Sequence, residues 1–311
     1  MPPRLYTWIN GKCRTDDGGG METAFVEIYV DDLKRSVQEW TDGFGFRQVA
    51  TARCDAGGWA SAALRQGRIG LVLTQGFLDE HPAQLYVSLH GTGVAHIALR
   101  TPDADAAHAA SLAAGARPAP ALDSLRGSRA GLCVAAFGDV VHSYVDDATA
   151  RDVTGVAAAL LHDDQTPEAA GPGLTRVDHF AVCLASSRLD AAVAFYRDAL
   201  GFREIFQEFI TVGPQAMRSR VVQSPSGLVT FTIIAPEPDA VPGQIDDFLK
   251  QHGGDGIQHV AFASDDAVSA VRTLTDRGVR FLRAPGSYYE LLTQRVTPKS
   301  APLPSCASGT C

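Results

Sequence analysis

The sequence contains an internal duplication, which is clearest in two short phrases. HGTGVAH begins at residue 90, and HGGDGIQH begins at residue 252. Self-similarity over so long an interval indicates two copies of one structural module. Each copy must bury an apolar face, so the 311 residues are predicted to form two related domains.

The elements around these phrases follow the same order in both copies. Alternating apolar residues at 24–30 and 176–184 predict half-buried strands, and the helical patterns that follow end at a glycine within FGFR or LGFR. Further strands are predicted at 68–75, 94–99, 228–236 and 257–262, and helix–turn–strand segments at 104–118 and 266–282. This order predicts an α+β fold of two mixed sheets.

Changes in composition divide the chain. The breaker cluster AAGPGL at 169–174 marks the end of a linker, and the DDGGG run closes an N-terminal extension. The predicted parts are a disordered extension (1–20), a first domain (21–147), a linker (148–174), a second domain (175–292) and an aberrant tail (293–311).

Composition excludes several classes of partner. The formal net charge is −8 and the sequence pI is near 5.5, which argues against nucleic acid or an anionic membrane surface as a partner. No apolar run approaches the length of a membrane span, and no secretory leader is recognisable. The cysteines show no C-x-x-C spacing, so we expect reduced thiols and a cytoplasmic protein.

Histidines at matched places in the repeat suggest a metal site. The shared phrases place His96 opposite His259 and Glu27 opposite His179. Two neutral imidazoles and one carboxylate on a rigid sheet would form the facial triad of non-heme Fe(II) oxygenases. Such a centre leaves positions open for a 2-oxo acid and for O2, which are the partners that we expect.

Many phrases, in the correct order, resemble one known family. The second half is similar to the catalytic half of the 4-hydroxyphenylpyruvate dioxygenase and 4-hydroxymandelate synthase family, whose members are vicinal oxygen chelate proteins built from paired βαβββ modules. The resemblance covers about residues 21–292. It rests on VDHFAVCL, FYRDALGFREIF, VGPQAMRSRVVQSPSG, PGQIDDFLKQHGGDGIQHVAF, DRGVRFLRAPGSYYELL, LRQGRIGLVLTQ, HGTGVAHIAL and FGDVVH.

The resemblance implies roles for six residues. His179 and His259 match two Fe(II) ligands, Ser219 matches a serine that lines the substrate site, and Thr232 lies on the same wall. The dioxygenase branch carries Asn in a phrase of the type LNEP, whereas this chain has Ile234 in IIAP. That difference, together with Gln223 in VVQS, is more similar to the synthase branch, which hydroxylates the benzylic carbon of 4-hydroxyphenylpyruvate.

The chain departs from the family pattern after YYELL. The family's third ligand is a glutamate on a late strand of the type FFEVIER, which is absent, and residues 293–311 are rich in Pro, Ser and Cys. Glu290 is the only glutamate after His259, and it lies in the YYELL loop. We expect Asp265 and Asp266 to cap a helix rather than to bind metal. Three functions therefore stay open: a mandelate synthase, a homogentisate-forming dioxygenase, and an inactive truncated member.

The first half contains a set of its own. Glu27, His96 and His142 would form a two-histidine, one-carboxylate set with the ligand types exchanged. A remnant of duplication is the simpler interpretation, and a second, permuted metal site is the alternative. We also consider a homodimer as the assembly.

Overall fold

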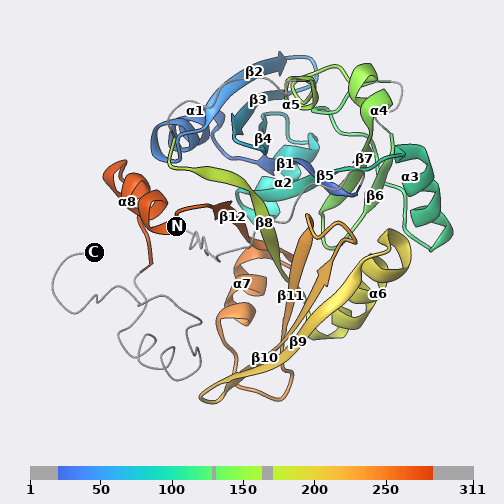
Figure 1. Cartoon of the computed structure of the whole chain (residues 1–311), viewed down its shortest axis with the longest axis vertical. Helices are drawn as coiled ribbons and strands as arrows, with labels where there is room; N and C mark the ends of the chain where they lie inside the picture. The colour runs from blue at the N-terminus through green and yellow to red at the C-terminus, as the bar shows by residue number, and fades with distance from the viewer. Residues whose placement is uncertain (1–19, 128–130, 163–170, 283–311) are drawn as a thin grey trace. The chain divides into compact units, whose positions relative to one another are not determined.

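Two mixed β-sheets form the framework of the molecule (Figure 1). The structure is a computed structural model, and it describes residues 20–127, 131–162 and 171–282. The described residues up to Val279 belong to one compact unit, and Arg280–Leu282 belong to a second. The strands of the first sheet lie between Glu22 and Val145, and those of the second lie between Leu174 and Ser264.

Seven described strands form the first sheet, in the order β2-β3-β4-β1-β5-β7-β6. The central strand β1 pairs in parallel with β4 and antiparallel with β5, and β5 pairs in parallel with β7. The strands are β1 (Glu22–Tyr29), β2 (Arg47–Cys54), β3 (Trp59–Gln66), β4 (Ile69–Gly76), β5 (Gly93–Arg100), β6 (Cys133–Ala135) and β7 (Val141–Val145).

Five described strands form the second sheet, in the order β12-β8-β11-β10-β9. Here β8 is central, with β11 parallel on one side and β12 antiparallel on the other. The strands are β8 (Leu174–Cys183), β9 (Arg203–Val212), β10 (Gln215–Gln223), β11 (Thr230–Pro236) and β12 (Gly256–Ser264). The order β9-β10-β11-β8-β12 repeats β2-β3-β4-β1-β5 strand for strand, so the predicted duplication and α+β fold class are confirmed.

Apolar spacing and glycine caps explain the helices. In α6 the buried residues recur at helical spacing from Leu189 to Leu200, and the helix ends at Gly201 with φ +67°. In α8, Asp266 accepts a hydrogen bond from the backbone of Ser269, so the predicted cap is confirmed. The helices are α1 (Leu33–Gln38), α2 (Pro82–His90), α3 (Ala104–Ala113), α4 (Asp147–Asp152), α5 (Ala158–Leu161), α6 (Leu189–Leu200), α7 (Gln244–His252) and α8 (Ala267–Asp276), with a π-helical turn η1 (Glu39–Gly43) and a 3-10 turn η2 (Ser186–Arg188).

The repeated HG phrase is the junction between a helix and a strand. His90 ends α2 and His252 ends α7, and the following Gly91 and Gly253 adopt φ of +74° and +77°. The two histidine rings stack on each other, with centroids 4.3 Å apart. The duplicated phrase therefore brings its own two copies into contact.

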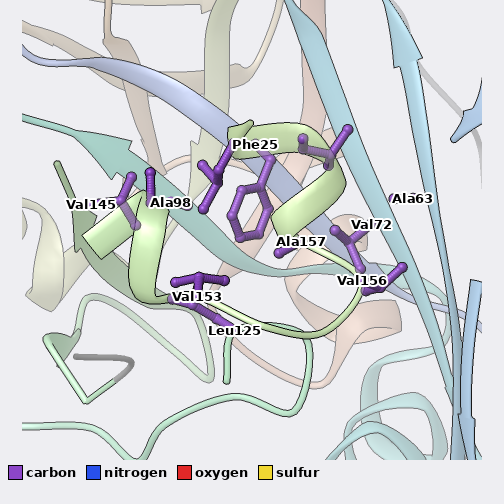
Figure 2. Packing of buried hydrophobic residues seen from close by; sticks show 12 residues of the cluster. Phe25, Ala63, Val72, Ala98, Leu125, Val145, Val153, Val156 and Ala157 are labelled. Atoms are coloured by element: carbon purple, nitrogen blue, oxygen red, sulfur yellow. The ribbon is translucent and has the colours of Figure 1, made fainter. Parts of the chain in front are cut away.

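The segment that we assigned to a linker contains part of the first core. Figure 2 shows Val153, Val156 and Ala157 packed in one cluster with Phe25 and Val72 of the first sheet. These three residues lie between helices α4 and α5, and the helices add Ala150, Leu160 and Leu161 to the same cluster. The described residues 148–162 thus extend the first domain, and the predicted start of a linker at 148 needs correction.

Two predicted strands, one after α3 and one after α8, do not form regular strands in the structure. After α3, the only pairing at 116–118 is an isolated bridge between Pro118 and Val134, and residues 279–282 after α8 have no assigned secondary structure. Gly115 and Gly278, both at positive φ, turn the chain before each segment. The predictions for residues 1–19, 163–170 and 283–311, including Glu290, lie outside the described residues.

Candidate metal centre

His179 and His259 lie on the same face of the second sheet. The β8–β12 ladder pairs His259 with Ala181 and Ala261 with His179, and residues that are paired across a ladder share a face. The two imidazole rings meet edge to face with centroids 5.6 Å apart. The structure thus brings together the two residues that the sequence predicted as ligands.

Each ring has its Nδ1 nitrogen bonded to the preceding residue, and within the described residues its Nε2 nitrogen has no hydrogen bond. His179 Nδ1 donates to Asp178 Oδ2 at 3.0 Å, and His259 Nδ1 donates to Gln258 Oε1 at 3.3 Å. Both acceptors lack a proton, so a neutral ring must carry its lone pair on Nε2. His259 Nε2 is buried without a hydrogen-bond partner among the described residues, and an orphaned buried nitrogen of this kind fits a metal ligand.

Burial also keeps His259 in its metal-binding form. Loss of solvent, followed by repulsion from His179, lowers the pKa of His259 to about 4. Hydrogen bonding to His179 is the main cause that lowers the pKa of Asp178. At neutral pH the imidazole of His259 is therefore uncharged, and the carboxylate of Asp178, which bonds to His179, is ionised.

The four predicted substrate-site residues share the face of the two histidines. In the β10–β11 ladder Ser219 pairs with Ile234, Thr232 with Val221, and Gln223 with Thr230. Thr232 also pairs with Ala181, the partner of His259, and alternate residues of a strand share a face. Ser219 is buried, and the Gln223 side chain donates to Thr230 Oγ1 at 3.0 Å. The register thus gathers all six predicted residues on one surface.

Helix α7 closes part of this surface with apolar side chains. Ile245 forms a buried cluster with Cys183 and Met217, against which Ile234 packs. The side chain at 234 therefore lies in an apolar environment, and an amide at this position would need a polar partner there.

The described residues include two of the predicted ligands of this centre, His179 and His259. No group of three or more His, Cys, Asp or Glu side chains in residues 20–127, 131–162 and 171–282 is arranged to hold a metal ion. Asp265 and Asp266 lie at the start of α8, as expected, where Asp266 caps the helix. Within the described part of the chain, the candidate metal-binding side chains at this centre are thus the two imidazoles.

The structure corrects our alignment of the two modules. In the first sheet Glu27 pairs with His96, and in the second Ala181 pairs with His259. Phe25 consequently occupies the place of His179, and it meets His96 edge to face at 5.3 Å, as His179 meets His259. Glu27 corresponds to Ala181, which lies two residues beyond His179, the residue that we aligned with it. An alignment error of two residues keeps every side chain on the same face of the sheet, so the alternating apolar pattern does not reveal it.

Glu27 and His96 of the first-module set belong to one hydrogen-bonded network, and His142 lies outside it. Glu27 accepts from Thr74, Ser124 and His96, while His96 Nε2 bonds to Ser143 at 2.7 Å. His142 lies on the opposite face, where Nε2 meets the Tyr196 hydroxyl at 2.9 Å. A permuted metal site at Glu27, His96 and His142 is therefore wrong, and the interpretation as a remnant of duplication accounts for the arrangement.

His142 is expected to make the protein less stable in acid. Burial, followed by repulsion from His96, lowers the pKa of His142 to about 3. Between the unfolded pKa near 6.5 and this value the unfolded chain binds the extra proton, so the free energy of unfolding falls as pH falls, by at most about 1.4 kcal/mol per pH unit. Urea unfolding from pH 7 to pH 3.5 should show a shallower decline for His142→Gln than for the unaltered protein; parallel curves would contradict this assignment.

Sequence reasoning missed the partners of the two histidines. Asp178 and Gln258 each precede a predicted ligand, and on a regular strand the side chains of neighbouring residues point to opposite faces. Irregular pairing changes this, because the β8–β12 register shifts at both residues. The signal available in the sequence was a polar residue directly before each of the two histidines.

The two matching family models support the duplication. Both are described as the glyoxalase/bleomycin resistance protein/dioxygenase superfamily; one matches residues 25–135 and the other matches residues 176–297. No helix in the described ranges is both long and apolar enough to span a bilayer.

Similar proteins narrow the family. A solved structure of a mutant 4-hydroxymandelate synthase from Streptomyces coelicolor is 36% identical with a TM-score of 0.74, covering 89% of this chain and 80% of that one. A 4-hydroxyphenylpyruvate dioxygenase from a Pseudomonas species is 30% identical over 92% of this chain and 78% of its own length. A probable 4-hydroxyphenylpyruvate dioxygenase from Aspergillus fumigatus is 27% identical over 88% of this chain and 75% of its own length. The chain belongs to the 4-hydroxyphenylpyruvate dioxygenase and 4-hydroxymandelate synthase family.

Proposed function

We propose that the protein is an Fe(II)-dependent oxygenase that converts 4-hydroxyphenylpyruvate and O2 to 4-hydroxymandelate and CO2. The observation that carries the proposal is the pair of imidazoles with centroids 5.6 Å apart on one sheet face, where the Nε2 atom of His259 is buried and has no hydrogen-bond partner among the described residues. A relative named as a 4-hydroxyphenylpyruvate dioxygenase supports the substrate class, and a relative named as a 4-hydroxymandelate synthase supports the product.

His179 and His259 would hold the iron through Nε2. Bound Fe(II) supplies activation of O2 and a binding point for the 2-oxo acid, the chemistry of two-histidine, one-carboxylate centres. The neutral state of His259 lets it bind a cation without first losing a proton. The third ligand is assigned to no described residue.

Ser219, Thr232, Gln223 and Ile234 would position the substrate. The Ser219 and Thr232 hydroxyls can orient polar groups of the ligand, whereas Ile234, packed against the Cys183–Met217–Ile245 cluster, offers an apolar contact. A small change in where the ring and side chain lie decides which carbon is closest to the reacting centre, because displacements of about 1 Å alter such reactions strongly. Ile234 in an apolar environment favours the benzylic outcome.

Two alternatives follow from specific observations. Curated relatives named as dioxygenases favour homogentisate as the product. The presence of only two ligands within the described residues favours an inactive member. The alternatives differ in measurable products and not only in rate.

Turnover with 4-hydroxyphenylpyruvate separates the three functions. Purified protein with Fe(II), ascorbate and substrate should consume O2, release CO2 and form 4-hydroxymandelate. Homogentisate is an isomer of 4-hydroxymandelate, so the products must be identified by chromatography against standards rather than by mass alone. Homogentisate would establish the dioxygenase, and no oxygen uptake by protein that retains iron would establish the inactive member.

A further inference from the structure

We propose that Asp178 is a positioning residue for the metal centre, which holds His179 with Nε2 toward the cation and makes that nitrogen a stronger donor. The proposal rests on the proposed metal centre and extends it to a residue outside the ligand set. Its basis is a pair of irregularities in the β8–β12 ladder, each located at the residue before a ligand.

Twin β-bulges bring these neighbours to the ligand side. The register passes from Ile257–Val182 to His259–Ala181, which leaves Gln258 as an extra residue on β12. It then passes from Ala261–His179 to Phe262–Val177, which leaves Asp178 extra on β8. A bulge turns an extra residue out of strict alternation, so its side chain can lie beside that of its neighbour.

The carboxylate of Asp178 is fixed through both of its oxygens. Oδ2 accepts from His179 Nδ1 at 3.0 Å, and Oδ1 accepts from Arg176 at 3.4 Å. A carboxylate behind an imidazole fixes the tautomer and raises the basicity of the far nitrogen. Gln258 makes the equivalent contact to His259 with a neutral amide, so the two ligands differ in the charge behind them.

The first module has the same bulges without the polar side chains. There the register leaves Ala95 extra on β5 and Ala24 extra on β1, the positions of Gln258 and Asp178. Neither alanine can hold a ring. His96 instead uses both nitrogens within the protein, on Glu27 and Ser143. Polar residues therefore occupy the two bulges in the module whose histidines keep a nitrogen available.

Cobalt binding to the full chain tests this role without turnover. Calorimetric and visible-absorption titration with Co(II) should show about 10- to 100-fold weaker binding for Asp178→Asn, which keeps an acceptor but removes the charge. Asp178→Ala should bind more weakly still and lose the Nδ1–H tautomer of His179 in ¹⁵N spectra, and Asp178→Glu should recover part of the affinity. Glu204→Gln is the matched control, because it removes a carboxylate that pairs with Arg220 on the same sheet and touches no histidine.

The outcomes separate this proposal from the metal centre itself. Unchanged Co(II) affinity in Asp178→Asn and Asp178→Ala, with binding lost in His179→Ala, would overturn the positioning role and leave the centre intact. Equal losses of affinity in Asp178→Asn and Glu204→Gln would reduce the effect to general destabilisation and also overturn it. Wild-type binding by His179→Ala would overturn the proposed centre.

Discussion

His259→Ala is expected to remove bound iron from the protein. The rings of His179 and His259 lie with centroids 5.6 Å apart, and the loss of His259 leaves a single imidazole at the proposed centre, which cannot hold a ferrous ion against buffer and chelator. Each protein is loaded anaerobically with Fe(II), desalted and analysed for metal. The iron content should be stoichiometric in the unaltered protein and at background in His259→Ala. Any oxygen uptake with 4-hydroxyphenylpyruvate should be lost with the metal.

His108→Ala provides the matched control for this experiment. His108 lies on α3 of the first module, where Nε2 meets the carbonyl of Cys133 at 3.3 Å, so its removal also deletes a partly buried imidazole. Its iron content should equal that of the unaltered protein. Stoichiometric iron in His259→Ala would show that the metal binds elsewhere, and the proposed centre would then be wrong.

The duplication could be predicted from the sequence because strands, helices and HG phrases recur in the same order in both halves. The spacing of apolar residues within each segment is enough to predict each of these elements. The α2 and α7 helices before the HG phrases were not predicted, since their patterns are short and partly polar. Asp178 and Gln258 were missed because bulges depend on pairing between strands distant in sequence. The side of the sheet taken by His142 likewise depends on the partner strand, which no local pattern reveals.

The corrected alignment accounts for the difference between the two modules at the proposed metal centre. Phe25 occupies the position of His179, so the first module has no counterpart of that predicted ligand, and Glu27 occupies the next position along the same face. Ser61 and Thr74 match Ser219 and Ile234 by register, and they bond to each other at 2.8 Å next to Glu27. The face that could receive a ligand in the second module is thus closed by internal hydrogen bonds in the first.

Glu27→Ala is expected to lower the free energy of unfolding by about 3–5 kcal/mol, because it leaves buried partners without their acceptor. Glu27 is 1% exposed and His96 is 0% exposed, so water cannot replace the lost hydrogen bonds. Three donors lose a partner at once, namely Thr74, Ser124 and His96. Urea unfolding at pH 7 measures the change.

Iron content distinguishes this structural role from a metal-binding one. Glu27→Ala, loaded under conditions in which it stays folded, should hold as much Fe(II) as the unaltered protein, because the first-module network is satisfied by protein groups alone. Glu80→Ala removes an exposed glutamate from the same module and should change stability by less than about 0.5 kcal/mol. A fall in bound iron with Glu27→Ala, without a matching fall in stability, would instead restore a metal site to the first module.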